Sequence, residues 1–301
     1  MSQFAPRFIL CPIDLSSASA IVLGWARLFA ETYDARVTVL HADWLEYPPY
    51  FLASQTEELS AEDRKHRAAL DKILGTLARG NLGPRVRHNI NVLEGHPVEI
   101  ILKYAEEHHP GLIVLGSNGR SGVARMLLGS VAENVMRQAA VPTLVVPTFA
   151  DNPAQPSVSR VLCPINFTEH GLQCLEQSAE VATAFGAELM VTHSVEQRYA
   201  DLKEAQDRLC QWVPDAERRH CSVTEAVRHG KPAEQVLMAA RDRAVDLIVL
   251  SAQHSPFLEF TTPGTTTERV MRHADSAVLV LPGMQVATSA EPVTKGVAST
   301  T

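Results

Sequence analysis

A glycine-rich segment that follows the apolar run LIVLG carries the residues best suited to chemistry. Gly116, Gly119 and Gly122 follow this run at close spacing, and Gly129-Ser130 begins the next helical pattern. Glycine lets a backbone turn tightly and approach a ligand with no Cβ in the way. The N–H groups and the dipole of a helix start favour an anion, and the Ser130 hydroxyl adds a donor. The segment therefore predicts a phosphate site at the end of a buried strand.

The spacing of this segment, G-x2-G-x9-G-S/T, is neither of the two commonest nucleotide fingerprints. It lacks GxGxxG after the first strand, and it lacks GxxxxGK followed by Ser or Thr. Arg120 and Arg125 are nearby cations within the segment. Each arginine either contacts the ligand or stays solvated, and the sequence leaves both readings open.

Composition and charge exclude several classes of protein. Hydrophobic residues make up 46% and charged residues 20% of the 301 residues, which is typical of a globular chain. The chain has 27 Lys and Arg residues and 34 Asp and Glu residues, and the resulting net charge of −7 argues against nucleic acid as a partner. No apolar run approaches the roughly 18 residues that span a bilayer, so we expect no membrane contact.

Histidine and cysteine patterns indicate no second kind of chemistry. The 12 histidines show no compact spacing of metal ligands, and the HExxH, GxSxG and catalytic Cys-His patterns do not occur. We therefore expect no metal site and no catalytic residue. The five scattered cysteines form no CxxC pair, which favours reduced thiols and a cytoplasmic protein.

The chain contains two copies of one pattern. FILCPIDLS returns 152 residues later as RVLCPINFT, and VTVLH returns as LMVTH. EGHPVEIIL, LIVLG, GSVAENVMR and PTLVVP return 135 residues later as HGKPAEQVL, LIVLS, GTTTERVMR and AVLVLP. The offset falls by 17 because the first copy carries 17 extra residues between His41 and Gly95. Six blocks in the same order predict two domains of one fold.

These repeats set the expected domain boundaries. The first domain covers 1–148 and the second covers 160–283. The stretch between them, 149–159, is rich in Pro, Ser and Asn and is expected to be a linker. Residues 284–301 lack apolar periodicity and are expected to form a flexible tail.

Each copy alternates short apolar runs with amphipathic helical patterns. In the first copy the runs FILCPI, RVTVLH, VRHNINVLEG, LIVLG and TLVVP are expected strands. Four helices are expected between them: one capped by Ser16 or Ser17, then 60–79, one starting at Pro97, and 129–140. This order predicts an α/β fold in which each domain has a five-stranded, mostly parallel open sheet with helices on both faces. Such sheets bind ligands at the carboxyl ends of the strands.

The glycine spacing resembles that of the universal stress protein family. The resemblance extends to the Pro-Ile-Asp that ends the first strand, to the Gly-x-Pro before the third helix and to the closing PTLVVP. It covers both copies, so the chain resembles a tandem universal stress protein. The fold that the resemblance implies is Rossmann-like, of the adenine-nucleotide α/β hydrolase type.

The resemblance also implies a site for ATP, with or without magnesium. In ATP-binding members the glycine motif holds the phosphates and ribose, the aspartate after the first strand faces the ribose or adenine, and the end of the second strand lies near the base. Taken alone, Asp14 is equally well explained as a helix cap. The residues expected to contact the nucleotide are Pro12, Ile13, Asp14, His41, Ala42, Leu115, Gly116, Gly119, Arg120, Gly129, Ser130 and Val131.

The second copy differs from this motif at the positions expected to contact the nucleotide. Ser251 and His254 replace the first two glycines, and Asn166 replaces the aspartate. A Cβ at both former glycines should block close approach to a phosphate. We therefore expect the second domain to bind ATP weakly or not at all, and to serve a structural role or hold another ligand.

The function expected from the sequence is that of a cytoplasmic ATP-binding stress-response or regulatory protein. Its partner would be an adenine nucleotide, and the last strands PTLVVP and AVLVLP would pair the two domains within one chain. A homodimer of the whole chain is a further expectation. The alternatives are an interaction module for a non-nucleotide ligand and a slow ATP-hydrolysing enzyme. The insertion DWLEYPPYFLASQTEEL is read as a lid, an interaction surface or a plain surface loop.

Overall fold

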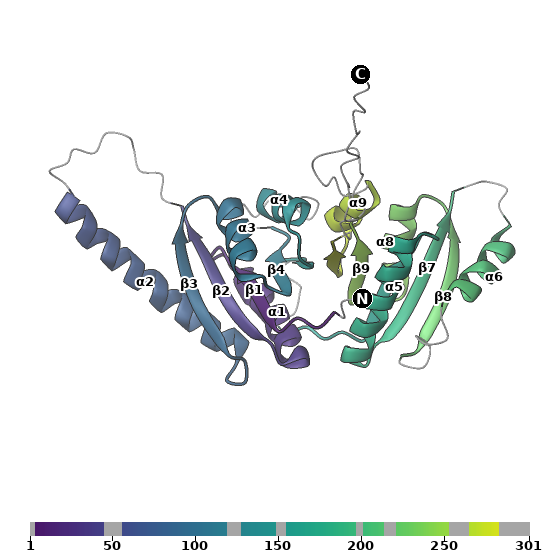
Figure 1. The fold of residues 1–301 in the computed structure, drawn as a ribbon, viewed down its shortest axis with the longest axis horizontal. Coiled ribbons are helices and arrows are strands. Elements are labelled where there is room, and N and C mark those ends of the chain that lie inside the picture. Colours follow the sequence, from purple (N-terminus) through teal and green to yellow (C-terminus); the bar gives the residue numbers. More distant parts are fainter. Residues whose placement is uncertain are drawn as a thin grey trace, which may run out of the picture.

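The computed structural model describes residues 4–44, 56–118, 128–148, 155–196, 201–213, 221–252 and 265–282, with the backbone alone at 56–64 and 265. Within these ranges no helix is both long and apolar enough to cross a membrane. The two halves of the chain lie side by side, the first drawn purple to teal and the second green to yellow (Figure 1).

Both halves repeat the same succession of strands and helices. The first half contains β1 (Phe8–Pro12), α1 (Ser19–Tyr33), β2 (Arg36–Asp43), α2 (Thr56–Leu82), β3 (His88–Glu94), α3 (Pro97–His108), β4 (Leu112–Gly116), α4 (Ser130–Gln138) and β5 (Thr143–Val146). The second half contains β6 (Arg160–Pro164), α5 (Glu169–Phe185), β7 (Glu188–Val195), α6 (Leu202–Trp212), β8 (Val223–His229), α8 (Pro232–Asp242), β9 (Leu247–Ser251), α9 (Thr265–His273) and β10 (Ala277–Leu281).

The strands form one ten-stranded sheet in the order β3-β2-β1-β4-β5-β10-β9-β6-β7-β8. Within each half all pairs are parallel, and the halves join where β5 and β10 pair antiparallel, with Val145 opposite Val278. This architecture confirms the predicted α/β fold with mostly parallel sheets. In the first half the chain continues from β1 to β2 on one side and later returns to β4 on the other side. That reversal opens a crevice at the carboxyl ends of β1 and β4.

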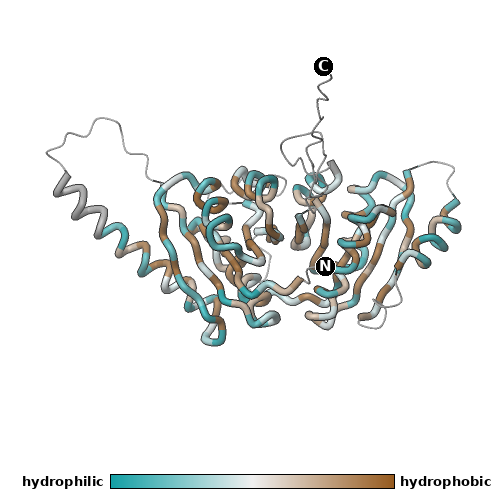
Figure 2. The backbone as a smooth tube through the Cα atoms, viewed as in Figure 1, coloured by the Kyte–Doolittle hydropathy of each residue, from teal (hydrophilic) through white to brown (hydrophobic). Residues whose placement is uncertain are grey.

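Side-chain alternation along the strands covers both faces of the sheet. Val37 and Val39 of β2 pack in the same cluster as the residues of α1 and α2, whereas Leu40 packs with those of α3. The apolar residues run along the strands and the inward helix faces (Figure 2). Between the halves, Phe29 of α1 meets Phe185 of α5 edge-on at a centroid distance of 5.1 Å.

Two helices of the first half begin differently from expectation. Neither Ser16 nor Ser17 caps α1: the N-cap position is Ala18, and no side chain accepts a hydrogen bond there. The helix α2 starts at Thr56 rather than at 60 and has 27 residues, against 11 for α6. Part of the 17-residue insertion therefore lengthens α2, and residues 45–55 of the insertion lie outside the described part.

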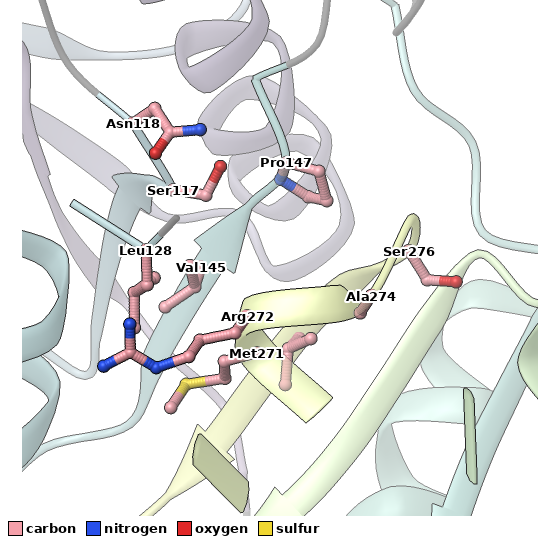
Figure 3. A pocket seen from close by; sticks show the side chains of 10 residues that line it. Ser117, Asn118, Leu128, Val145, Pro147, Met271, Arg272, Ala274 and Ser276 are labelled. Atoms are coloured by element: carbon pink, nitrogen blue, oxygen red, sulfur yellow. The ribbon is translucent and has the colours of Figure 1, made fainter. Parts of the chain in front are cut away.

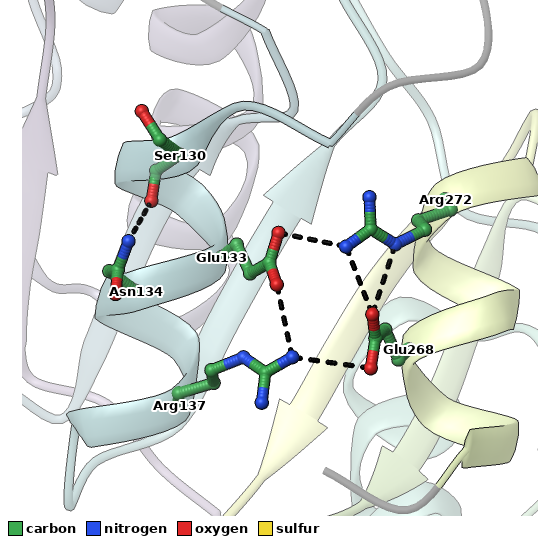
Figure 4. A network of polar contacts seen from close by, with 6 residues as sticks. All are labelled: Ser130, Glu133, Asn134, Arg137, Glu268 and Arg272. Atoms are coloured by element: carbon green, nitrogen blue, oxygen red, sulfur yellow. Dashed lines mark hydrogen bonds and ion pairs between the residues drawn. The ribbon is translucent and has the colours of Figure 1, made fainter. Parts of the chain in front are cut away.

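A four-residue ion-pair network joins α4 of the first half to α9 of the second (Figure 4). Glu133 lies 3.0 Å from Arg137 and 2.9 Å from Arg272, and Glu268 lies 3.2 Å and 2.9 Å from the same two arginines. Glu268 and Arg272 are the counterparts of Glu133 and Arg137 in the repeat. The hydrogen bond to Glu268 raises the pKa of Arg272, which favours its charged form.

Candidate functional site

A cavity of about 530 Å³ opens in the first half at the carboxyl ends of β1, β2 and β4. Ten of the twelve residues predicted to contact a nucleotide line it, whereas Gly119 and Arg120 fall outside the described residues. The topology brings these ten together from four separate parts of the chain; their role as ligand contacts stays a prediction. The ten are Pro12, Ile13, Asp14, His41, Ala42, Leu115, Gly116, Gly129, Ser130 and Val131.

Three helices begin at this cavity, and none of them has a side-chain cap. The N-cap positions of α1, α3 and α4 are Ala18, His96 and Gly129, and no side chain accepts a hydrogen bond at any of them. Ala18, Pro97 and Gly129 line the cavity. The first N–H groups of a helix have no partner in an i to i−4 bond, and its dipole is positive at this end. At α1 the N–H groups of Ser19 and Ile21 already donate to the carbonyls of Ser16 and Ala18, so the starts of α3 and α4 offer more free donors. The arrangement therefore favours a ligand with negative charge.

A buried hydroxyl supports this reading of the cavity wall. Ser19 is 1% exposed and lines the cavity at the start of α1. Its Oγ is buried and has no hydrogen-bond partner within the described part of the chain. Leaving a buried hydroxyl without a partner costs free energy, so a ligand acceptor at this position would stabilise the site.

Asp14 stabilises the turn between β1 and α1 and also lines the cavity. Its Oδ1 accepts a hydrogen bond of 3.0 Å from the backbone N–H of Ser16, in the turn between β1 and α1. This contact holds the turn and does not cap the helix itself, because α1 begins three residues after Ser16. Asp14 also lines the cavity, so the turn fixes a carboxylate at its wall.

His41 is buried and ties β2 to the end of β1. Its Nδ1 lies 2.8 Å from the carbonyl oxygen of Ile13, and a carbonyl only accepts, so Nδ1 carries the proton. In the second half His193 makes the same contact with Ile165 at 3.0 Å. Since both halves keep this bond, it serves the fold as well as the cavity wall in the first half.

Gly116 is explained by packing within the protein. A Cβ at this position would lie 3.0 Å from Cγ2 of Thr148 and 3.2 Å from Cγ2 of Val22 on α1. Such distances are shorter than ordinary carbon contacts, so the glycine lets the end of β4 pack against α1. At the far end of the glycine motif, the N–H of Gly129 donates to the carbonyl of Ser117 at 2.7 Å and closes the loop between them.

Sequence reasoning missed several residues that line the cavity beyond β2. Asp43 and Trp44 directly follow the predicted His41-Ala42, so their position at the end of the same strand could have predicted that they line the cavity. His66 comes from the lengthened part of α2, where the sequence pattern held no such signal, and its Nε2 lies 3.0 Å from Oδ2 of Asp43.

In the described part of the corresponding region of the second half, side chains pack on one another at the ends of β6 and β7. Phe167, the counterpart of Leu15, packs on His193 at a centroid distance of 4.3 Å, and Arg208 lies over its ring at 4.2 Å. At the start of α5, Thr168 accepts a hydrogen bond from the N–H of Gly171 and caps the helix. His254, which replaces the second glycine, lies outside the described residues.

A second pocket lies between the halves but is too small for a ligand. Ser117 and Leu128 of the first half face Met271 and Arg272 of the second half around it (Figure 3). Its volume is about 10 Å³, close to the space that a single water molecule needs. The pocket therefore belongs to the interface between the halves.

Comparison with known proteins gives matches in both halves. The model of the universal stress protein family matches residues 7–147 and 157–282. Universal stress protein MJ0531 of Methanocaldococcus jannaschii is 33% identical over 142 residues, which cover 46% of this chain and 80% of that protein. Universal stress protein Mb2028c of Mycobacterium bovis is 23% identical over 295 residues, covering 90% of this chain and 96% of that protein.

Two solved structures have a similar fold over most of the chain. The crystal structure of a universal stress protein from Archaeoglobus fulgidus aligns with a TM-score of 0.65 at 21% identity, covering 93% of this chain and 97% of that one. A universal stress protein structure from Pseudomonas aeruginosa aligns with a TM-score of 0.61 at 18% identity, covering 93% and 94%. At these identities the similarity shows the fold.

Proposed function

Because this chain belongs to the universal stress protein family through both of its halves, we propose that it is an ATP-binding regulatory protein with one nucleotide site, in the first domain. The observation that carries this proposal is the convergence of three uncapped helix starts on one cavity of about 530 Å³. A triphosphate supplies the negative charge that these helix starts favour. The volume lies within the range of cavities that hold small-molecule ligands.

The residues around the cavity fit a nucleotide. Ser130 and the N–H groups at the start of α4 would hold phosphate oxygens, and the buried Ser19 hydroxyl would gain an acceptor. The Asp14 carboxylate would accept hydrogen bonds from ribose hydroxyls. A magnesium ion would arrive with the phosphates, since the described residues include no group of three metal-ligating side chains.

The second domain, residues 160–283, would serve as a partner domain without ATP. Its helix α5 is already capped by Thr168, and Phe167 covers His193. The antiparallel pairing of β5 with β10 would hold it against the first domain, residues 1–148, across the linker at 149–159. In this arrangement ATP acts by favouring one conformation or partner surface of a cytoplasmic stress-response protein.

Isothermal titration of ATP tests the proposal with a matched pair of variants. Ser130→Glu places a negative charge at the start of α4, where it suits the helix but repels phosphate. We expect wild type to bind one ATP per chain and Ser130→Glu to bind at least about tenfold more weakly, a loss of about 1.4 kcal/mol or more. Thr265→Glu makes the same change in the second domain and should leave ATP affinity unchanged. Loss of binding in Thr265→Glu alone would assign the site to the second domain.

A further inference from the structure

The cavity has a second end at the carboxyl end of β2, beside the start of α3, where aromatic and polar side chains line the wall. Asp43 ends β2 and Trp44 follows it, and their partners come from helices α2 and α3, which cover opposite faces of the sheet. Asp43 pairs with His66 of α2 at 3.0 Å, and Trp44 meets the ring of His96 edge-on at 4.8 Å. Asp43, Trp44 and His66 line the cavity.

Trp44 is the feature of this end that packing leaves unexplained. It is 54% exposed, whereas Trp25 is 7% exposed and buried in the core. An indole face at a cavity wall is a surface on which a planar ring can stack. The Asp43–His66 pair opposite supplies acceptor and donor atoms for the polar edge of such a ring.

The second half lacks all three residues. Val195 ends β7 and Glu196 follows it, at the positions that Asp43 and Trp44 hold at the end of β2. Counted from the fully buried pair Leu74 and Leu209, His66 corresponds to Asp201, which is the N-cap of α6. His66 lies inside α2, whereas its counterpart Asp201 precedes the first residue of α6. The insertion has therefore lengthened α2 at its N-terminal end, before His66.

We propose that Trp44 and the Asp43–His66 pair form a recognition end for the planar base of the bound nucleotide, and that the insertion serves to build it. This inference rests on the proposed function, because in both the starts of α1 and α4 hold the phosphates. The site would thereby distinguish a base-bearing nucleotide from a bare polyphosphate. Trp44 and His66 would be specificity-determining residues of the first domain.

Titration of ATP and of inorganic tripolyphosphate separates the two ends of the cavity. We expect Trp44→Ala to weaken ATP binding by about tenfold, the order expected for one lost base stack, while tripolyphosphate binds as weakly as to wild type. Trp44→Phe keeps a ring and should retain most of the affinity. His66→Ala should weaken ATP and spare tripolyphosphate in the same way, and Glu196→Ala, at the counterpart of Trp44, should change neither ligand.

Tryptophan fluorescence gives an independent readout. ATP should quench the emission of wild type and of Trp212→Phe but not that of Trp44→Phe, while tripolyphosphate quenches none of them. Equal ATP affinity in wild type, Trp44→Ala and His66→Ala would overturn the recognition end and leave the phosphate site standing. Equal loss of ATP and tripolyphosphate in Trp44→Ala would overturn it too. A wild type that binds neither ligand would overturn the proposed function and this inference together.

Discussion

Glu133 of α4 and Arg272 of α9 lie 2.9 Å apart across the interface between the halves, and their repeat counterparts Glu268 and Arg137 lie 3.2 Å apart in the reverse direction. The four side chains are between 23% and 28% exposed. The network is thus less open to solvent than most single surface pairs, and each charge has two partners.

A double-mutant cycle on Glu133→Ala and Arg272→Ala should show that this pair stabilises the interface. We expect a coupling energy of about 1 kcal/mol, at the upper end for exposed pairs because each charge belongs to a network. Urea unfolding measures it. The pair Lys103–Glu107, whose side chains are 73% and 54% exposed, is the control and should couple by a few tenths of a kcal/mol at most. Equal coupling in the two cycles would contradict the role of the network.

Gly116→Ser should destabilise the first domain, and Val22→Cys should restore part of the loss. The new Cβ would press on Val22 and Thr148, which costs about 1–3 kcal/mol when the core cannot yield. The second half carries this very pair, Ser251 with Cys174, at the counterparts of Gly116 and Val22. Thermal unfolding of the single and double variants measures the effect, and additive losses would show that the two positions do not interact.

His41→Ala and His193→Ala should cost similar stability but differ in ligand binding. Each removes the hydrogen bond to a strand-end carbonyl, at Ile13 or Ile165, and leaves that buried acceptor without its donor. We expect a loss of about 1–3 kcal/mol in the free energy of unfolding for each variant. Only His41→Ala should also weaken ATP binding, because His41 lines the cavity of the first domain. Equal ATP affinity in both variants would remove His41 from the site.

The buried thiol of Cys11 should make the protein lose stability in alkali. Burial raises the pKa of Cys11 from 9.0 to about 12, so the folded protein keeps the proton longer than the unfolded chain does. The contribution to stability is complete below pH 9 and is lost as the pH rises from 9 towards 12. The loss is about 1.4 kcal/mol per pH unit from this group. Cys11→Val should flatten this part of the curve in urea unfolding between pH 8 and 11, and an unchanged slope would contradict the assignment.

Much of the fold could be predicted because its determinants are local and occur twice. The apolar runs of β1 and β4 and the helical stripes recur in both halves, so each copy supports the assignment of the other. The strand ends then fall at one edge of a parallel sheet. The resemblance to the universal stress protein family added that Asp14, His41 and Ser130 lie together at this edge.

The remaining features depend on tertiary contacts that a pattern does not encode. The role of Gly116 follows from the distance to Val22, a residue nearly a hundred positions earlier. The N-cap of α1 is Ala18, although Ser16 and Ser17 are better cap formers. The N–H of Ser16 is instead held by the Asp14 carboxylate, in the turn that precedes the helix. His66 reaches the cavity only through the length of α2, and its partner Asp43 comes from another strand.

The antiparallel seam of β5 and β10 relates two copies that are translated as one polypeptide. In a dimer of identical chains, every substitution appears on both sides of the two-fold axis, so a change that closes one site closes both. When the two copies belong to one chain, a substitution in one copy leaves the other copy unchanged. The ion-pair network has the same residue types in both copies, whereas Glu196 occupies the position of Trp44 and Phe167 occupies the position of Leu15. Fusion therefore allows an asymmetric molecule to be built on a symmetric interface, and its assembly does not depend on protein concentration.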